Sequence, residues 1–335
     1  MFYDLLGWEV NVLKIAVVGA TGEVGRMFLK LFEEYKLIDE IRELRLFASE
    51  RSEGQKIKVG SQYYTVEKLE EEKMKERYDY IFFSAGGSVS EKYAPIAEKA
   101  GNVVIDNSSF FRMKENIPLV VPEINGEILK GYRGIIANPN CSTIQMVLAL
   151  NNVYKSLKIK EIVVSTYQAV SGAGNKGLKE LLSQQQGSKE VKHFPKMIYN
   201  NVIPLIGDKL ENGFTKEEEK MIEETKKIFV DKNMKIFPTT VRVPVLYGHS
   251  ESIFVSTEKD ASINELIDLI EATPNVIYSE EYITPIEVAG TDNTYVSRLR
   301  KPEEKAFLMW VIADNIRVGA ATNAIRILLK HRELN

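Results

Sequence analysis

The sequence contains a single cysteine, Cys141, and only three histidines in 335 residues. One cysteine excludes an internal disulfide and any zinc site built from several cysteines. Cys141 is therefore either a small buried side chain or a reactive thiol. We expect no metal site.

An excess of charge and a long apolar run are also missing. The 44 Lys and Arg against 47 Asp and Glu give a formal net charge of −3, which supplies no broad cationic field for nucleic acid or acidic lipid. The longest uncharged stretch, Gly134 to Tyr154, is interrupted by polar residues and cannot span a bilayer. The first residues lack a basic segment and a small-residue cleavage site, so no secretory signal is expected. These absences predict a folded cytoplasmic protein without nucleic-acid or membrane partners.

The first half of the chain alternates strand-like and helical patterns. Such alternation is typical of parallel βαβ units in an α/β fold. The expected elements are Val12–Val18, Glu23–Tyr35, Glu43–Ala48, Tyr80–Ser84, Ser90–Lys99, Val103–Asp106, Gly134–Ala137 and a helix at Cys141–Tyr154. The charged stretch Glu67–Arg77 is interpreted as a solvated helix.

The second half predicts a mixed α+β domain. Strands are expected at Glu161–Ala169, Thr239–Val245, Ser252–Thr257 and Ala306–Ala313, and helices at Lys176–Gln186 and Lys216–Phe229. A helix near Ile263–Ile270 and a last helix containing Ile316, Ala320, Ala324, Ile327 and Leu328 each place apolar residues on one side. The chain length suggests two domains.

A glycine-rich turn follows the first strand. The segment Gly19-Ala-Thr-Gly22-Glu-Val-Gly25 lies between a strand and a helix, a context in which backbone N–H groups approach a pyrophosphate. The spacing is GxxGxxG rather than GxGxxG, and a bare turn of this kind often marks only a tight connection. The flanking strand and helix favour nucleotide binding.

The end of the second strand indicates which nucleotide binds. NAD sites usually carry an acidic residue there for the ribose 2′-hydroxyl. Here Arg51, with Ser49 and Ser52, can instead receive a 2′-phosphate. Glu50 is the competing candidate for an NAD role, and the whole loop can also be a solvated surface segment. The pattern favours NADP.

Cys141 follows a predicted buried strand and opens a predicted helix. At that position the helix dipole and free N–H groups lower a thiol pKa, and the amides of residues 140–143 can hold an oxyanion. The polar flank Asn138-Pro-Asn favours a nucleophile over a structural cysteine. His249, just after a strand that carries Arg242, is the candidate base.

Seven motifs along the chain resemble those of the aspartate-semialdehyde dehydrogenase family. They are GATGEVG, Ala48-Ser-x-Arg-Ser52, Ser84-Ala-Gly-Gly, Asp106-Asn-Ser-Ser-x-Phe-Arg112-Met, Asn138-Pro-Asn-Cys-Ser-Thr143, Gln168-Ala-Val-Ser-Gly-Ala-Gly174 and Arg242-Val-Pro-Val-x-x-Gly-His249. They span about Lys14 to Leu328 in the expected order. The resemblance implies NADPH-dependent reductive dephosphorylation of L-aspartyl-4-phosphate to aspartate semialdehyde, in lysine, threonine and methionine biosynthesis.

The resemblance also implies roles for individual residues. Cys141 is the nucleophile, His249 the acid/base and Gln168 the residue that positions the acyl intermediate. The substrate is bound by Arg242 at its carboxylate, Glu217 at its ammonium, and Arg112, Asn140 and Lys220 at its phosphate. From charge pattern alone, Glu217 and Lys220 would be a surface ion pair at i, i+3. The cofactor residues are Gly19, Thr21, Gly22, Glu23, Val24, Gly25, Ser49, Arg51, Ser52, Ser84, Gly86, Gly87, Ser171, Gly172 and Asn315.

The implied fold is a Rossmann-type NADP-binding domain with an inserted α+β catalytic and dimerisation domain. We expect the first at residues 12–141 plus 315–335, the second at 142–314, and an N-terminal extension at 1–11. A homodimer or a tetramer is expected. Two alternatives remain: an N-acetyl-glutamyl-phosphate reductase, which Glu217 disfavours because an acetylated nitrogen carries no charge, and a catalytically silent nucleotide-binding relative, which retention of Cys141 and His249 disfavours.

Overall fold

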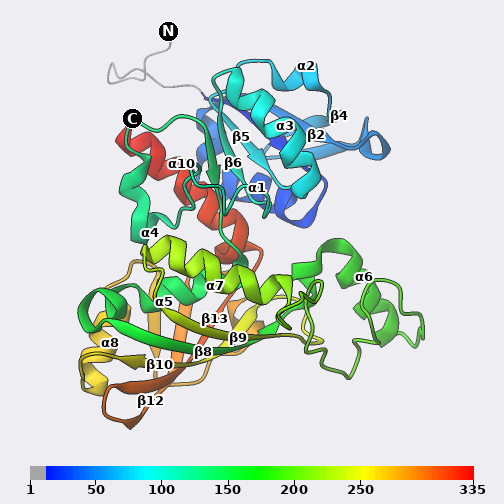
Figure 1. Ribbon diagram of the computed structural model, residues 1–335. Coiled ribbons are helices and arrows are strands. Elements are labelled where there is room, and N and C mark those ends of the chain that lie inside the picture. Colours follow the sequence, from blue (N-terminus) through cyan, green and yellow to red (C-terminus); the bar gives the residue numbers. More distant parts are fainter. Residues whose placement is uncertain (1–12) are drawn as a thin grey trace. The chain divides into compact units, whose positions relative to one another are not determined.

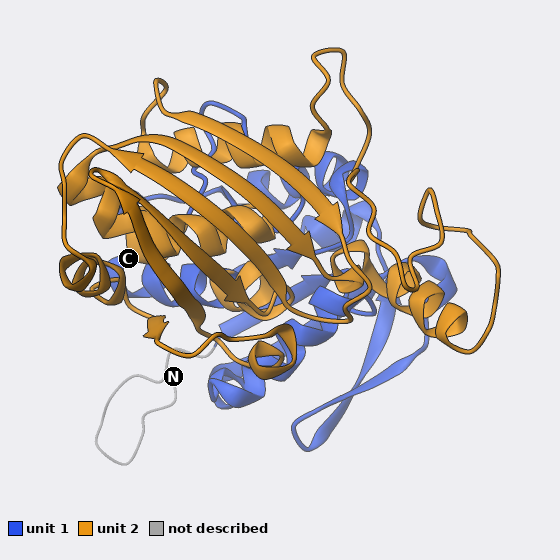
Figure 2. Cartoon of the chain, turned by 90° about the horizontal axis from the view of Figure 1, so that it is seen from below, with its two compact units in different colours: residues 1–120, 126–138, 324–335 blue, residues 121–125, 139–323 orange. Residues whose placement is uncertain are grey.

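The computed structural model describes residues 13–335, so the expected extension and the strand start at Val12 lie outside the described residues. The chain forms two compact units, coloured separately in Figure 2. The first contains the chain up to Val120, Gly126–Asn138 and Ala324–Asn335, and the second contains Val121–Asn125 and Pro139–Asn323. The units therefore separate after residues 138 and 323, where the sequence suggested domain limits after 141 and 314.

The first unit is built on a seven-stranded sheet in the order β3-β4-β2-β1-β5-β6-β7. All neighbours are parallel except β3 and β4. The strands are β1 Leu13–Val18, β2 Ile41–Ala48, β3 Lys56–Val59, β4 Gln62–Lys68, β5 Tyr80–Phe83, β6 Val103–Asp106 and β7 Ile135–Ala137. Continuous apolar runs such as Tyr80–Phe83 form the central strands because both faces of a parallel sheet are covered.

Strand β1 lies between β2 and β5, so the chain order reverses there. In open α/β sheets, ligands bind at the carboxyl ends of the strands beside such a reversal. The helices of this unit include α1 Glu23–Glu34, α2 Glu71–Met74 and α3 Gly87–Lys99, with short 3-10 turns at Leu37–Glu40, Glu50–Ser52 and Gly126–Leu129 (Figure 1). The expected α/β class and Rossmann-type arrangement are confirmed.

The predicted solvated helix at Glu67–Arg77 is wrong. That stretch contains the end of β4, at Glu67 and Lys68, and the short helix α2. The rest of β4 lies before it. Val66 is buried in the sheet, and Glu67 receives a hydrogen bond from Arg45 of β2 at 2.7 Å. These contacts with a neighbouring strand outweigh the local helical charge pattern.

The second unit is built on a six-stranded mixed sheet in the order β11-β12-β13-β10-β8-β9. The strands are β8 Ile159–Gln168, β9 Lys235–Arg242, β10 His249–Thr257, β11 Val276–Ser279, β12 Thr294–Glu303 and β13 Ala306–Ala313. Helices α5 Cys141–Leu157, α7 Lys216–Phe229 and α8 Ile263–Glu271 lie on one face of the sheet, and Figure 2 shows the strands uncovered on the other face. The remaining helical segments are α4 Pro122–Asn125, a 3-10 turn at Val170–Ala173, α6 Gly174–Gln185 and α9 Pro285–Val288.

Residues alternate between the two faces along the strands of this sheet. In β8, Ile162, Val164 and Thr166 point to the helix side and are buried, whereas Val163 and Tyr167 are exposed. Strand β9 is an edge strand, which accommodates Pro238, and it ends at Arg242 rather than at the expected Val245.

The expected last helix has a different beginning. Residues Arg317–Thr322 form a π-helical segment, and the α-helix α10 runs from Asn323 to Leu334. Single π turns are rare and occur frequently at functional sites. In α10, His331 is buried and forms a hydrogen bond with the Tyr80 hydroxyl at 2.8 Å.

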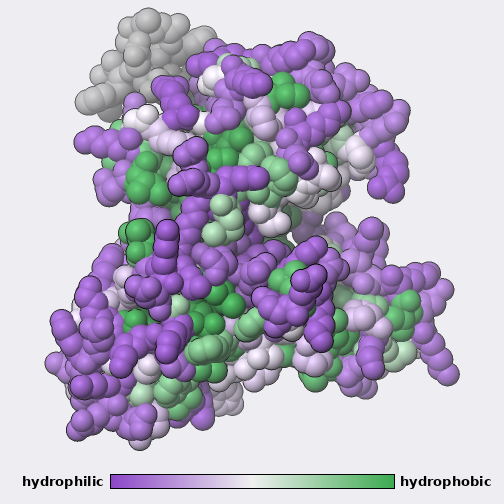
Figure 3. Space-filling model, viewed as in Figure 1, coloured by the Kyte–Doolittle hydropathy of each residue, from purple (hydrophilic) through white to green (hydrophobic). Residues whose placement is uncertain are grey.

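Hydrophilic side chains cover much of the face seen in Figure 3, and hydrophobic groups appear there as separate patches. Among residues 13–335, no helix combines the length and apolar character needed to cross a membrane.

Candidate active site

The glycine-rich turn joins β1 to α1 in the first unit. Gly19 has a φ of +87°, and a Cβ atom there would lie 2.8 Å from the carbonyl carbon of Ser84. A Cβ atom on Gly25 would collide with the Gly19 carbonyl oxygen, so α1 packs directly on the turn. Gly22 is the N-cap of α1, and no side chain caps the helix. Thr21 lies in the turn before the helix, and Glu23 and Val24 are its first residues, so the start of α1 has the form of an anion-binding helix N-terminus.

The two candidates for ribose recognition, Glu50 and Arg51, lie in the loop after β2 and differ in their partners. Glu50 forms an ion pair with Lys68 at 3.1 Å, whereas no described group pairs with the exposed side chain of Arg51. The Thr21 and Ser52 hydroxyls are 3.4 Å apart, so this loop lies beside the glycine turn. Ser49 is the N-cap of the short turn that carries Arg51.

The other predicted ligands of the first unit lie after β5 and β6. The Ser84 hydroxyl donates to the Val18 carbonyl at 3.2 Å, and Gly86, with a φ of +92°, is the N-cap of α3, which begins at Gly87. Arg112 is buried and donates to the Asn107 carbonyl at 2.9 Å.

In the second unit, Cys141 is the first residue of α5 and is partly exposed. The side-chain oxygen of the N-cap Asn140 accepts from the amides of Ser142 at 3.0 Å and Thr143 at 3.4 Å. The amide of Asn140 itself donates to Glu224 at 2.6 Å. The amides of Asn140, Ser142 and Thr143, three of the four predicted oxyanion donors, therefore already have acceptors within the protein. The helix N-terminus can still favour the thiolate form of Cys141.

Glu217 lies at the centre of a buried polar cluster. Its carboxylate accepts from the Asn140 side chain at 2.9 Å and from Gln168 at 3.1 Å, and it pairs with Lys220 at 2.9 Å. Burial would raise the pKa of Glu217, but Lys220 and these hydrogen bonds outweigh it and lower the pKa to about 2. The i, i+3 pair exists as predicted, but it is not a surface ion pair, because Glu217 is buried.

Arg242 and His249 are linked through Ala169. The Arg242 guanidinium donates to the Ala169 carbonyl at 2.6 Å, and the Ala169 amide donates to Nδ1 of His249 at 3.1 Å. Burial lowers the pKa of Arg242, and the negative charges of Glu217 and Cys141 oppose this effect. Arg242 therefore lies close enough for the charges of Glu217 and Cys141 to act on it, and its guanidinium remains protonated.

The hydrogen bond to His249 fixes the state of its imidazole. Because Nδ1 accepts, the neutral ring carries its proton on Nε2. Burial and, to a smaller extent, the Arg242 charge lower the pKa of His249 to about 3, against an opposing effect of Glu217. Nε2 is buried and has no hydrogen-bond partner among the described residues. His249 therefore offers one free N–H donor and no free lone pair.

Gly172 lies over this pair. A Cβ atom at Gly172 would be 2.9 Å from the Arg242 guanidinium and 3.0 Å from Nε2 of His249. Asn315 fixes the adjoining backbone, because its side-chain oxygen accepts from the Gly248 amide at 2.9 Å and its side-chain nitrogen donates to the Ser171 hydroxyl at 3.0 Å. Ser171, Gly172 and Asn315, predicted as cofactor residues, thus adjoin Arg242 and His249.

The motifs did not identify two residues that contact the cluster. Glu224, which holds the Asn140 amide, lies seven positions after Glu217 on α7, so the helical period could have placed both on one face. Gly319, in the π-helical segment, lies against the nucleophile, because a Cβ atom there would be 2.7 Å from Cβ of Cys141. Nothing in the sequence indicates this second contact.

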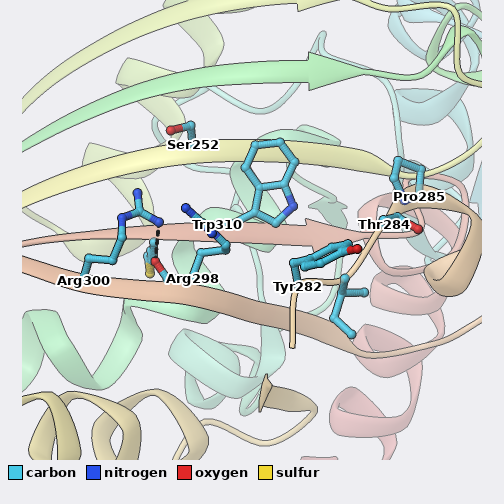
Figure 4. Close-up of a pocket in the computed structure, with 9 residues that line it drawn as sticks. Ser252, Tyr282, Thr284, Pro285, Arg298, Arg300 and Trp310 are labelled. Atoms are coloured by element: carbon cyan, nitrogen blue, oxygen red, sulfur yellow. Dashed lines mark hydrogen bonds between the residues drawn. The ribbon is translucent and has the colours of Figure 1, made fainter. Parts of the chain in front are cut away.

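In the described part of the chain, neither a metal-binding group nor the cavity shown in Figure 4 adds to this cluster of residues. Over residues 13–335, no group of three or more His, Cys, Asp or Glu side chains could hold a metal ion. A cavity of about 340 Å³ opens on the strand side of the second unit, where Tyr282, Arg298 and Arg300 surround Trp310 (Figure 4). None of the predicted site residues lines this cavity.

Comparison with known proteins gives a consistent result over most of the chain. Residues 14–132 match the family model "Semialdehyde dehydrogenase, NAD binding domain", and residues 150–318 match "Semialdehyde dehydrogenase, dimerisation domain". The chain is 50% identical to aspartate-semialdehyde dehydrogenase of Aquifex aeolicus over 94% of this chain and 96% of that protein. The Campylobacter jejuni enzyme is 44% identical over 96% and 98%. The crystal structure of aspartate semialdehyde dehydrogenase II of Vibrio cholerae, complexed with ASA, superposes with a TM-score of 0.92 at 42% identity, covering 96% of this chain and 98% of that one.

Proposed function

Because this chain belongs to the aspartate-semialdehyde dehydrogenase family, we propose that it catalyses the reversible, NADPH-dependent reductive dephosphorylation of L-aspartyl-4-phosphate to L-aspartate 4-semialdehyde. The observation that carries the proposal is the cluster in the second unit. Cys141 begins a helix within reach of the Arg242 charge, and Glu217 and His249 are buried beside them. We place the reaction in the synthesis of lysine, threonine and methionine.

In the proposed first step, the Cys141 thiolate attacks the acyl carbon. The new C–S bond replaces the C–O bond to phosphate, which leaves as inorganic phosphate. Arg242 binds the substrate carboxylate with two parallel hydrogen bonds, and Glu217 meets the ammonium group. Lys220 and Arg112, with the second amide hydrogen of Asn140, would contact the phosphate.

The buried cluster also supports a role for Gln168. Its side-chain nitrogen donates to Glu217 and its oxygen accepts from Thr166, so both ends are fixed. A fixed amide beside the nucleophile can hold the thioester in one orientation, which favours attack at its carbon.

His249 acts in this proposal as a neutral hydrogen-bond donor. The free Nε2–H would stabilise the oxyanion that forms when the thioester carbonyl carbon becomes tetrahedral. Collapse of that oxyanion breaks the C–S bond, which releases the aldehyde and returns the Cys141 thiolate. The charges balance without a proton from His249, so no imidazolium is required. A neutral histidine electrophile of this kind is an established catalytic device.

The residues of the first unit fit a nicotinamide dinucleotide. The uncapped start of α1 suits a pyrophosphate, and Gly19 and Gly25 leave no space for a side chain in the turn. NADPH, when bound, supplies the hydride to the thioester carbon. We propose NADP rather than NAD, because Arg51 has no described partner while Glu50 is paired with Lys68.

Arg51→Ala should raise the KM for NADP about tenfold to a hundredfold and leave the KM for NAD nearly unchanged, since only NADP carries the 2′-phosphate. Steady-state kinetics with both cofactors measure this. Glu50→Gln is the matched control from the same turn and should alter neither value by more than about twofold. An equal loss with both cofactors in Arg51→Ala would refute the 2′-phosphate role.

Glu217→Gln should raise the KM for aspartate semialdehyde about tenfold to a hundredfold, because the site loses the charge that meets the ammonium. The exposed Glu219 of the same helix provides the control, and Glu219→Gln should behave as the wild type. An unchanged KM in Glu217→Gln would remove the proposed ammonium contact. Activity with the N-acetylated five-carbon semialdehyde instead would favour the alternative reductase.

We also propose a cytoplasmic homodimer, which could pair further into a tetramer, with no metal, nucleic-acid or membrane partner. The uncovered sheet face of the second unit supports this, because Val163, Tyr167 and Phe237 expose apolar surface there and the matched family model is a dimerisation domain. Sedimentation would measure the assembly, and Phe237→Asp should weaken it.

The overall proposal is tested by phosphate-dependent reduction of NADP with aspartate semialdehyde. The rate should depend on both phosphate and semialdehyde. A rate that needs no phosphate would contradict the acyl-phosphate chemistry, and no reduction of either nicotinamide cofactor would favour the silent relative.

A further inference from the structure

Glu251 is a buried carboxyl that the proposed reaction does not use. It lies in β10 with no exposed surface, two positions after His249. Both of its oxygens lack a well-formed hydrogen bond to any described group. A carboxylate in such a place is strongly unfavourable unless a cation pairs with it.

Within residues 13–335, no cation acts on the Glu251 carboxyl. Its neighbours across the sheet are Thr166 on β8 and Val311 on β13. On the helix side it meets the amide of Gln145 in α5. The titratable groups nearest along these elements are His249 on its own strand, Tyr167 on β8 and Cys141 on α5, and the Tyr167 side chain is exposed on the opposite face of the sheet. Burial raises the pKa of Glu251 well above its usual range, and hydrogen bonding to Gln145 opposes this only in part.

Gln145, on helix α5, is likewise a buried polar side chain without a well-formed hydrogen bond. It is fully buried, and neither its oxygen nor its nitrogen has a well-formed hydrogen bond to another described residue. A primary amide and a protonated carboxyl group are complementary, since each offers one donor and one acceptor in a plane.

The positions of the two side chains connect them to the reacting groups. Gln145 follows Cys141 by four residues, which is one turn of α5, and Glu251 follows His249 by two residues, which returns to the same face of β10. The pair Gln145 and Glu251 therefore forms the row next to Cys141 and His249, between the same helix and the same strand.

We propose that Glu251 is a positioning residue, a neutral carboxylic acid whose contact with Gln145 fixes the register of the Cys141 helix against the His249 strand. This role rests on the proposed function of Cys141 and His249. A displacement of about 1 Å between reacting groups can cost about a hundredfold in rate. Because both polar groups are buried, they favour the one register in which they contact each other. An apolar contact would favour no single register in this way.

The experiment compares Glu251→Gln, Glu251→Leu and the double variant Glu251→Leu with Gln145→Leu. Glutamine keeps the neutral planar donor and acceptor, so we expect wild-type kcat and more stability than the wild type at alkaline pH. The reason is that a raised pKa in the folded state favours the fold only while the carboxyl is protonated, and this contribution is lost as the pH rises. The double variant removes both polar groups together and should remain folded.

Two readouts separate positioning from mere packing. The wild type should show the infrared carbonyl band of a protonated carboxylic acid at neutral pH, and Glu251→Gln should lack it. In the double variant, kcat should fall about tenfold to a hundredfold at unchanged KM, with a shifted pH profile for alkylation of the single thiol. Because the alkylation assay needs no substrate, the thiol and infrared results stand even if the proposed reaction is wrong.

Any one of the following spectroscopic or kinetic results would overturn the proposal. They are a wild type without the infrared band, a Glu251→Gln variant whose kcat falls more than about tenfold, or a folded double variant with wild-type kcat and alkylation profile. Glu251→Leu alone leaves Gln145 unpaired, and its thermal stability should fall below that of the double variant. Equal stability of the two would show that the side chains do not interact.

Discussion

Cys141→Ser should lower the phosphate-dependent oxidation of aspartate semialdehyde by about 10⁴-fold or more, while the protein still folds and binds NADP. Serine is nearly the same size, and the Asn140 cap and the contact with Gly319 do not involve the sulfur. What is lost is ionisation, since a hydroxyl is far less acidic than the thiol that the α5 N-terminus and Arg242 favour as a thiolate. Coupled spectrophotometric assays would measure the rate, and fluorescence titration would measure cofactor binding.

The chain offers an internal check on this result. Because Cys141 is the only cysteine, alkylation of the wild type by iodoacetamide modifies one known atom. Activity and free thiol should disappear together, and aspartate semialdehyde should protect both. Substantial activity in Cys141→Ser would end the covalent mechanism, whereas loss of cofactor binding would indicate damage to the fold.

Two substitutions of His249 should have different effects. His249→Asn should lower kcat about a hundredfold to a thousandfold, the usual cost of removing one oxyanion donor. His249→Gln should retain much more activity, because the glutamine amide can place an N–H near the position of Nε2. A proton-transfer role would make both variants equally poor, since neither amide titrates. The steady-state kcat of the two proteins separates these mechanisms.

The pKa of His249 gives the same hypothesis a second measurement. Burial and the Arg242 charge lower it to about 3, so the free protein should keep a neutral imidazole from pH 5 to pH 8, the range in which an ordinary histidine titrates. NMR of ring-labelled protein would detect the tautomer with its proton on Nε2. His193→Gln, at an exposed histidine, is the control and should leave kcat unchanged. An imidazolium signal from His249 near neutral pH would contradict the donor role.

Local patterns in the sequence predicted much of the fold. The α7 limits, Lys216–Phe229, and the β13 limits, Ala306–Ala313, agree with the prediction because period and flanking residues define them. The stretch around Glu67 failed because its structure depends on Arg45 in another strand. Charge pattern cannot report a partner that lies far away in the chain.

The sequence predicted which residues form the site, but not how their side chains are arranged and hydrogen-bonded. Motifs and family resemblance named Cys141, Arg242 and His249, and the structure brings them into one cluster in which Arg242 and His249 are buried. The state of each group was not predictable. The amides after Cys141 are engaged by Asn140, and the His249 proton lies on Nε2 because of the Ala169 amide. Both facts depend on hydrogen bonds that form only in the folded chain.

The contact between Gly319 and Cys141 determines when the surroundings of the thiol can form during synthesis. The two residues are far apart in sequence, and Gly319 is the later one. Synthesis proceeds from the N-terminus, so the first part of the chain can fold while Gly319 has not yet been added. A nascent chain therefore lacks one wall around the Cys141 side chain until Gly319 has been added and folded into place, and only then can it acquire the reactive centre.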